Sequence, residues 1–237
     1  WRVERIPSIR SGFRRVTDTI LLSSYCSLSS LSMIDTLFIF FYFDYMITQY
    51  GISAKHAGTI LTISEFLNMT VSPLASLIMD LYYISALGKH RTWILIMSVP
   101  CCLSFSLLWY SPSKLNYYSI VSYCLSMLLL FNLFYGTLLV AYEGTITLLT
   151  SKEAKIAQLN AFGLCLGSIL SIIPAVIGVV ITSISSISAK TSLIIVGTST
   201  SSFILICYLF FVVITVESNE DIIEIQDNKS SKTIEMI

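Results

Sequence analysis

Long apolar runs alternate with short polar segments along the chain. A membrane-spanning helix needs about 20 mostly apolar residues, because the hydrocarbon core is about 30 Å thick and an α-helix rises about 1.5 Å per residue. Six runs are long enough: about 19–48, 57–86, 93–110, 116–142, 156–183 and 191–216. The first run is one long or tilted helix, since two spans would need about 40 residues. The pattern predicts an all-α membrane protein with six transmembrane helices.

The polar segments divide the chain into three parts. Residues 1–17 form a basic N-terminal segment, residues 18–216 form the six-helix transmembrane domain, and residues 217–237 form an acidic linker or tail. The connections between the helices are short, so we expect sequence neighbours to be antiparallel neighbours in a bundle. Because residue 1 is Trp1, we also expect the chain to be a piece of a longer protein.

Composition agrees with a membrane protein and excludes several other classes. Only 12% of the residues are charged, whereas a soluble domain has about 25%. The formal net charge is zero, which gives no reason to expect nucleic acid as a partner. The six cysteines lie in apolar segments and form no CxxC pair, so we predict neither a metal site nor a disulfide framework. We also find no catalytic constellation and no glycine-rich phosphate loop, and we expect neither an enzyme nor a cofactor.

The basic residues predict an orientation. Lys and Arg are enriched on the cytosolic side of membrane proteins. If the N-terminus is cytosolic, eleven of the 14 basic residues fall on that side. We therefore expect both termini in the cytosol and membrane lipid around the helices.

Polar residues inside the predicted spans are the candidates for function, because a charge at mid-membrane costs about 2.5–3.5 kcal/mol on insertion scales. In the second predicted helix, Glu65, Asn68 and Ser72 lie on one face at helical spacing. This face lines a substrate or cation path, or else Glu65 is protonated and hydrogen-bonded to a neighbouring helix. Asp35, on an only partly polar face of the first predicted helix, is a further candidate for cavity lining. Asn132 and Tyr135 are candidates either as cavity lining or as inter-helix hydrogen bonds.

A second group of candidates lies near the predicted cytosolic helix ends. They are a gating loop or simple structural pairs. The group consists of Asp80, Gly88, Lys89, Arg91 and Glu143. None of the predicted spans holds a Lys or Arg in its interior, so neutral, cationic or zwitterionic cargo is easier to accommodate than an anion.

Two motifs in residues 52–162 carry a resemblance to a known family. The first comprises Ile52-Ser53, Ala57-Gly58, Pro73, Asp80, Gly88-Lys89-His90-Arg91 and Trp93. The second comprises residues 141–150, the polar segment 151–155 and residues 159–162. Together they resemble the N-terminal half of the major facilitator superfamily, in the glycoside–pentoside–hexuronide:cation symporter group that includes melibiose permease and lysophospholipid symporters.

The resemblance implies two inverted three-helix repeats within a twelve-helix secondary active transporter. The expected cargo is a sugar-like or lysolipid-like small solute, with Na⁺ or H⁺ as the coupling ion. The expected partner is the missing C-terminal six-helix half or a second copy of this chain.

The sequence departs from the family at its functional positions. The family's second-helix Arg falls on Glu65, and its two cation-binding acids fall on Asn68 and Ser72. The helix-four acid falls near Leu139 and the helix-one acid near Ser32. Asp35 and Glu65 are our hypothesis for a relocated proton or cation site. The lost acids favour the alternative, a degenerate, non-transporting membrane protein with a scaffold or regulatory role.

Overall fold

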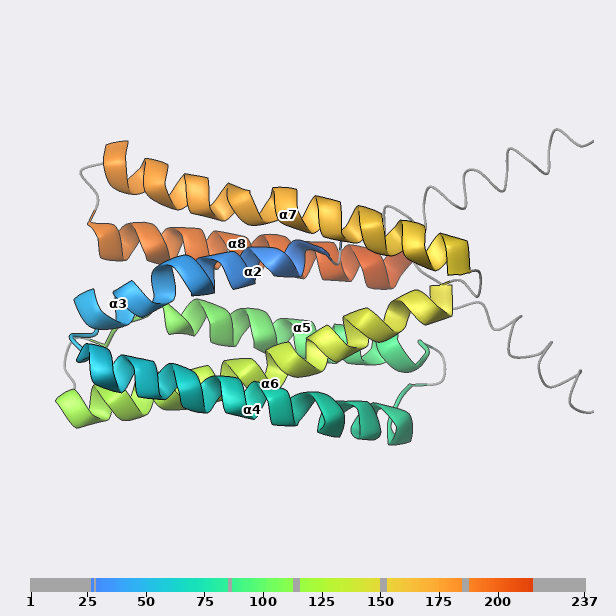
Figure 1. The fold of residues 1–237 in the computed structure, drawn as a ribbon, viewed down its shortest axis with the longest axis horizontal. Helices are drawn as coiled ribbons and strands as arrows, with labels where there is room; N and C mark the ends of the chain where they lie inside the picture. The colour runs from blue at the N-terminus through green and yellow to red at the C-terminus, as the bar shows by residue number, and fades with distance from the viewer. Residues whose placement is uncertain are drawn as a thin grey trace, which may run out of the picture.

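Six long helices lie side by side in the computed structural model, which describes residues 27, 29–84, 87–112, 116–149, 153–184 and 188–214 (Figure 1). The six described segments that are long and apolar enough to cross a membrane are Ser29–Thr48, Ala54–Leu81, Lys89–Leu108, Tyr117–Ile146, Glu153–Ile181 and Lys190–Ile214. Lipid tails offer no hydrogen-bond partners to the backbone, and an α-helix pairs its own backbone N–H and C=O groups. The predicted all-α membrane fold is therefore confirmed.

The first span contains four consecutive helical segments. They are η1 (Ser29–Leu31), α2 (Ser32–Leu37), the π-helical η2 (Phe38–Tyr42) and α3 (Phe43–Thr48). The predicted N-terminal part of this helix lies almost entirely outside the described residues, as do the basic segment 1–17, residues 150–152 and the tail 217–237.

The remaining spans are single helices. They are α4 (Ala54–Leu81), α5 (Lys89–Leu108), α6 (Tyr117–Leu149), α7 (Glu153–Ile184) and α8 (Ala189–Ile214).

Several helix ends differ from the sequence prediction. Helix α4 ends at Leu81, before the predicted 86, and α7 begins at Glu153, before the predicted 156. Helix α4 begins before the predicted 57, because the Ser53 side chain accepts a hydrogen bond from the His56 backbone N–H and caps the first turn. Helix α5 begins at Lys89, and so the predicted basic loop is mostly a first helical turn. Gly88 precedes it with φ +84°, a conformation that favours glycine. Helix α6 continues past the predicted 142 to Leu149, and in this extension Thr145 Oγ1 donates to the carbonyl of Ala141 at 2.7 Å.

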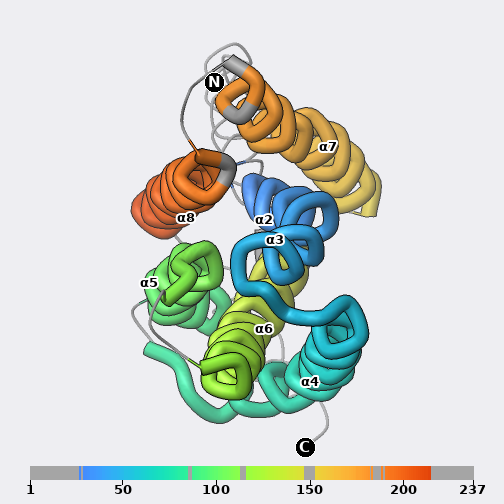
Figure 2. The backbone as a smooth tube through the Cα atoms, turned by 90° about the vertical axis from the view of Figure 1, so that its left-hand side faces the viewer, coloured from blue at the N-terminus to red at the C-terminus, as the bar shows by residue number. Residues whose placement is uncertain are grey.

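The helices are arranged in three groups when viewed along the bundle (Figure 2). Helices α5 and α8 lie on one side, α4 and α7 lie on the other, and the first span lies with α6 between them. The main neighbours of α6 are α5 and α4, and the main neighbour of α2 is α7. The expectation that sequence neighbours pack together holds for α5 and α6 but is wrong for α4 and α5, whose mutual contact is small.

Glycines explain which helices approach closely. A Cβ on Gly136 of α6 would lie 2.8 Å from Asn68 Oδ1 and 3.2 Å from Val71 on α4. A Cβ on Gly197 of α8 would collide with the ring of Trp109 at the end of α5. Small residues let membrane helices pack backbone to backbone, and these positions therefore set the α4–α6 and α5–α8 contacts.

An aromatic cluster holds α3 against the end of α5. Trp109 is fully buried, with Tyr42 and Tyr45 edge-on to it at centroid distances of 5.8 and 5.3 Å. Tyr45 donates its hydroxyl to the Trp109 carbonyl, and Tyr50 donates to the Leu108 carbonyl at 2.7 Å. The C-terminal half of the first span is therefore fixed by both apolar burial and hydrogen bonds.

Candidate functional site

Asp35 and Tyr135 join the first span to α6 near the middle of the bundle. The Tyr135 hydroxyl donates to Asp35 Oδ1 at 2.5 Å. Tyr135 is 7% exposed, and its ring packs against Phe131 with a centroid distance of 5.3 Å. The ring is thus held by apolar neighbours while the hydroxyl bonds to the carboxylate.

A first cavity, of about 220 Å³, brings together most of the predicted path residues. We call it the acid cavity. Its polar lining consists of Asp35, Glu65, Asn68, Asn132 and Tyr135, and its apolar lining of Ile34, Phe38, Ile39, Phe131 and Leu139. These residues come from the first span, α4 and α6. Ser72 is not part of the lining; its hydroxyl donates to the Asn68 carbonyl within α4 at 3.3 Å.

The two acids of this cavity are accessible. Asp35 and Glu65 both have exposed side chains, and no hydrogen bond joins the Glu65 carboxylate to another described residue. The alternative prediction for Glu65, a hydrogen bond to a neighbouring helix, therefore has no support among the described residues. A cation or proton that enters the acid cavity can reach both carboxylates.

The two asparagines of the acid cavity differ in their bonding. Asn132 is 3% exposed and donates from Nδ2 to the Ser64 carbonyl on α4 at 3.1 Å. This is the inter-helix hydrogen bond that the sequence left open as an alternative for Asn132. Asn68 Oδ1 is buried and has no hydrogen-bond partner. Asn132 therefore ties α4 to α6, while Asn68 keeps a free acceptor beside the cavity.

A second cavity, of about 320 Å³, lies on the other side of Asp35. We call it the hydroxyl cavity. Its lining consists of Ser29, Leu31, Ser32, Asp35, Thr36, Tyr135, Leu139, Tyr142, Gly163, Leu164, Gly167, Ser168 and Ser171. Ser29 is 5% exposed, and its Oγ has no hydrogen-bond partner. The cavity thus offers many hydroxyl groups and one buried hydroxyl that is unpaired.

The sequence did not predict the hydroxyl cavity. Small residues on a membrane helix, such as Gly163, Gly167, Ser168 and Ser171 of α7, favour close helix packing. That interpretation holds for Gly167, whose carbonyl accepts from Ser32 Oγ at 2.7 Å. The repeated serines were the available signal, because hydroxyls on one face of a membrane helix serve packing and cavity lining equally well.

The two cavities share three residues. Asp35, Tyr135 and Leu139 line both of them. The helices that line the cavities are the first span, α4, α6 and α7, and α5 and α8 lie on the opposite side of the bundle (Figure 2). Asp35 and Tyr135 therefore form a polar wall between a cavity with a second acid and a cavity with many hydroxyls.

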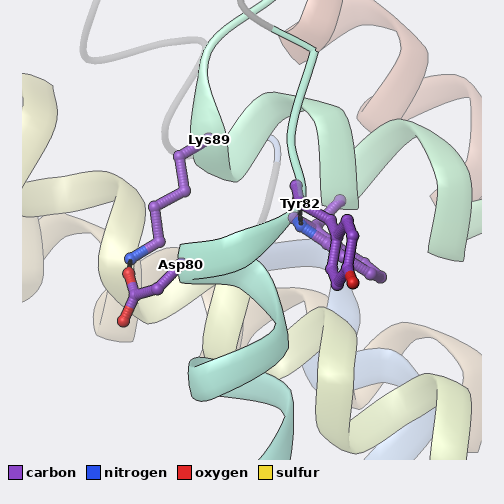
Figure 3. Close-up of polar contacts among 4 residues, drawn as sticks. Asp80, Tyr82 and Lys89 are labelled. Atoms are coloured by element: carbon purple, nitrogen blue, oxygen red, sulfur yellow. Dashed lines mark hydrogen bonds and ion pairs between the residues drawn. The ribbon is translucent and has the colours of Figure 1, made fainter.

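The candidates near the helix ends form bonds between three helices. Asp80 at the end of α4 pairs with Lys89 at the start of α5, and Figure 3 shows the two side chains meeting. Beside them, Trp93 Nε1 donates to the Tyr82 carbonyl at 2.7 Å. Arg91 is 7% exposed and donates to the Val212 carbonyl on α8. Thus α4, α5 and α8 are linked at this end of the bundle.

Glu143 is not brought into these bonds. Its side chain is exposed, and it forms no ion pair with a described residue. The structure explains the glycine at the neighbouring position 144, because a Cβ on Gly144 would collide with the His90 ring on α5.

Apolar helices of membrane-spanning length that enclose polar cavities, with acids reachable inside them, define a multi-pass membrane protein of the transporter type. A family model described as MFS/sugar transport protein matches residues 26–237. The chain therefore belongs to the major facilitator superfamily. None of the curated proteins compared with the chain matches it.

The family gives meaning to two positions that hold no acid in this chain. By the resemblance to the cation symporter group, two expected acids fall near Ser32 and Leu139, and both of these residues line the hydroxyl cavity. Glu65 and Asn68, which also replace functional residues of that group, line the acid cavity. None of the four positions at which the resemblance expects an acid holds one, while Asp35 supplies an acid between the two cavities.

Proposed function

We propose that this chain forms half of a secondary active transporter that moves a small hydroxylated solute, sugar-like or lysolipid-like, together with H⁺ or Na⁺. The observation that carries the proposal is the placement of Asp35 and Glu65 in one cavity, with Asp35 also lining a second. A carboxylate in a membrane interior is costly unless it is neutral or paired. Binding a proton or a cation removes that cost, which makes the acid cavity suitable for a coupling ion.

The hydroxyl cavity supports the choice of solute. Serine, threonine and tyrosine hydroxyls both donate and accept hydrogen bonds, and so they match the hydroxyl groups of a sugar or a glycerol backbone. The described lining of both cavities holds no Lys or Arg. This favours a neutral or zwitterionic solute over an anion.

The outer surface of the bundle and the bonds at one of its ends suggest how the proposed transporter sits in the membrane. Large apolar side chains of α4 and α7 point outward, among them Phe66, Met69 and Leu164, and they suit contact with lipid or with a second six-helix unit. We propose that the end with Asp80 and Lys89 faces the cytosol, with both termini. There the bonds of Asp80, Lys89 and Arg91 would hold α4, α5 and α8 together during a transport cycle.

The test is uptake by the full-length protein in proteoliposomes. The probes are radiolabelled hexoses, pentoses and disaccharides and a lysophosphatidylcholine, each with an imposed pH or Na⁺ gradient. Asp35→Asn and Glu65→Gln are expected to reduce gradient-driven accumulation at least about tenfold, because each removes an ion-binding carboxylate. Asp44→Asn is the matched control, since Asp44 is an exposed acid of the same span that lines neither cavity.

Two results would contradict the proposal in different ways. If the wild-type protein moves none of the probes, the transport function is wrong and the scaffold or regulatory role is favoured. If transport occurs but Asp35→Asn and Glu65→Gln leave its gradient dependence unchanged, the coupling site is wrong.

A further inference from the structure

Building on the proposed function, we infer that Tyr135 is the positioning residue that links ion binding in the acid cavity to solute binding in the hydroxyl cavity. Tyr135 and Asp35 are the polar side chains common to both cavities. Among the described lining side chains, this pair therefore offers a hydrogen-bonded connection between the two cavities.

The ring of Tyr135 is fixed, and its hydroxyl is the part that can change partner. The ring packs on Phe131, which in turn contacts Phe38 and Phe105 at centroid distances of 6.1 and 5.6 Å. A buried hydroxyl needs a hydrogen-bond partner, and an ionised carboxylate is a stronger acceptor than a neutral group. The Tyr135 hydroxyl therefore donates to Asp35 as long as Asp35 carries its charge.

Loading the acid cavity changes this hydrogen bond. A proton that enters beside Glu65 and binds Asp35 converts its carboxylate into a neutral acid, which can donate as well as accept. Tyr135 keeps its own proton throughout. Its hydroxyl is then free to accept from Asp35 and to donate into the hydroxyl cavity, where a solute hydroxyl takes the place of the lost acceptor. A bound cation has the same effect, because it competes with Tyr135 for the carboxylate oxygens.

The surroundings of the pair favour such a switch. Ser29 provides an unpaired buried hydroxyl in the hydroxyl cavity, and Asn68 Oδ1 provides an unpaired acceptor beside the acid cavity. Each cavity thus holds a polar atom with unused bonding capacity on its own side of Asp35 and Tyr135.

The decisive variant is Tyr135→Phe in the full-length protein, because it keeps the ring and removes only the hydroxyl. With trapped pyranine reporting protons and the radiolabelled probes above reporting solute, we expect solute exchange without a gradient to persist. Accumulation driven by a pH gradient is expected to fall at least about tenfold, equivalent to about 1.4 kcal/mol. A Na⁺ gradient replaces the pH gradient if wild-type uptake follows Na⁺.

Two tyrosines of the same helix serve as matched controls. Tyr123 donates to the Leu107 carbonyl at 3.2 Å and lines neither cavity, and so Tyr123→Phe is expected to retain wild-type coupling. Tyr142 lines only the hydroxyl cavity. Tyr142→Phe is expected to weaken solute affinity without changing the number of ions moved per solute.

A spectroscopic measurement tests the pair without any solute. Infrared difference spectra between acidic and alkaline pH are expected to contain a carboxyl band that disappears in Asp35→Asn. In Tyr135→Phe this band should shift, because its hydrogen bond is lost. An unshifted band, or unchanged coupling in Tyr135→Phe while the wild-type protein is coupled, would falsify the role of Tyr135. Absence of coupling in the wild-type protein would instead contradict the proposed function itself.

Discussion

Ser32 of α2 and Gly167 of α7 are joined by a hydrogen bond of 2.7 Å from the serine Oγ to the glycine carbonyl oxygen. The same hydroxyl also lies 2.8 Å from the carbonyl oxygen of Ser29 in η1. Its single proton is therefore shared between the carbonyl oxygens of Ser29 and Gly167. A Cβ on Gly167 would lie 3.3 Å from Ser32 Oγ. A side chain at position 167 would therefore press on this hydroxyl and require it to shift.

Enlarging Gly167 is expected to separate α2 from α7. Gly167→Val should lower the free energy of unfolding by about 1–3 kcal/mol, the usual range for overpacking, and Gly167→Ala should lower it less. Thermal unfolding in detergent measures both. Gly58→Ala is the control, because a Cβ there meets nothing within 4 Å; an equal loss in that variant would show that the Ser32 contact is not the cause.

Gly197→Ala is expected to destabilise the α5–α8 contact. The added methyl group would collide with the Trp109 ring, which is fully buried among Tyr42, Tyr45 and Phe105 and has little room to move. We expect a loss of about 1–3 kcal/mol in the free energy of unfolding. Gly197→Ala should lower the free energy of unfolding less in the Trp109→Phe variant than in the wild-type protein, because the smaller Phe ring leaves room for the methyl group. Strictly additive losses would contradict a direct clash.

Asn132→Ala and Asn68→Ala are expected to differ in their effect on stability. Asn132 loses its hydrogen bond to the Ser64 carbonyl, which is worth about 1 kcal/mol between membrane helices. Asn68 Oδ1 has no partner to lose, so its substitution should destabilise less. Denaturant titration of the two variants measures the difference, and a larger loss for Asn68→Ala would be the contrary result.

Breaking the Asp80–Lys89 pair is expected to have a small effect on stability. The two side chains are 57% and 31% exposed, and exposed ion pairs contribute about 0–1 kcal/mol. A double-mutant cycle with Asp80→Asn and Lys89→Met measures the coupling energy. Glu143→Gln is the control at the same end of the bundle. If transport falls much more than stability, the pair acts in the transport cycle, and if both are unchanged the gating role is wrong.

Hydropathy was sufficient for the six spans, because a lipid core permits few alternatives to a long apolar helix. The ends of the spans were less predictable. Gly88 and Ser53 fix helix starts through a positive φ and a side-chain cap, which are local effects that an apolar run does not reveal. Glu65, the second acid of the acid cavity, could also be predicted as a site residue, because it is an acid within an apolar helix.

The assembly of the site required the tertiary structure. Glu65, Asn68 and Ser72 share a helical face in the sequence, yet only Glu65 and Asn68 line the acid cavity. Tyr135 was a candidate from its polarity alone, and its position between two cavities depends on how α6 packs against both α4 and the first span. The sequence pattern contains no information on such packing partners, which here are often not sequence neighbours.

The π-helical turn η2 has a consequence for the geometry of the first span. Such a turn holds one residue more than an α-helical turn, and one residue corresponds to a rotation of about 100°. Asp35 and Tyr42, seven positions apart, would share a face in an unbroken α-helix. The extra residue of the π-helical turn offsets this relation by about 100°, and both side chains meet α6, Asp35 through Tyr135 and the fully buried Tyr42 through Cys124. If this turn became α-helical with no residue deleted, the acid would rotate by about 100° relative to Tyr42 while the sequence of the span stayed the same, so the π-helical turn is itself a determinant of the site.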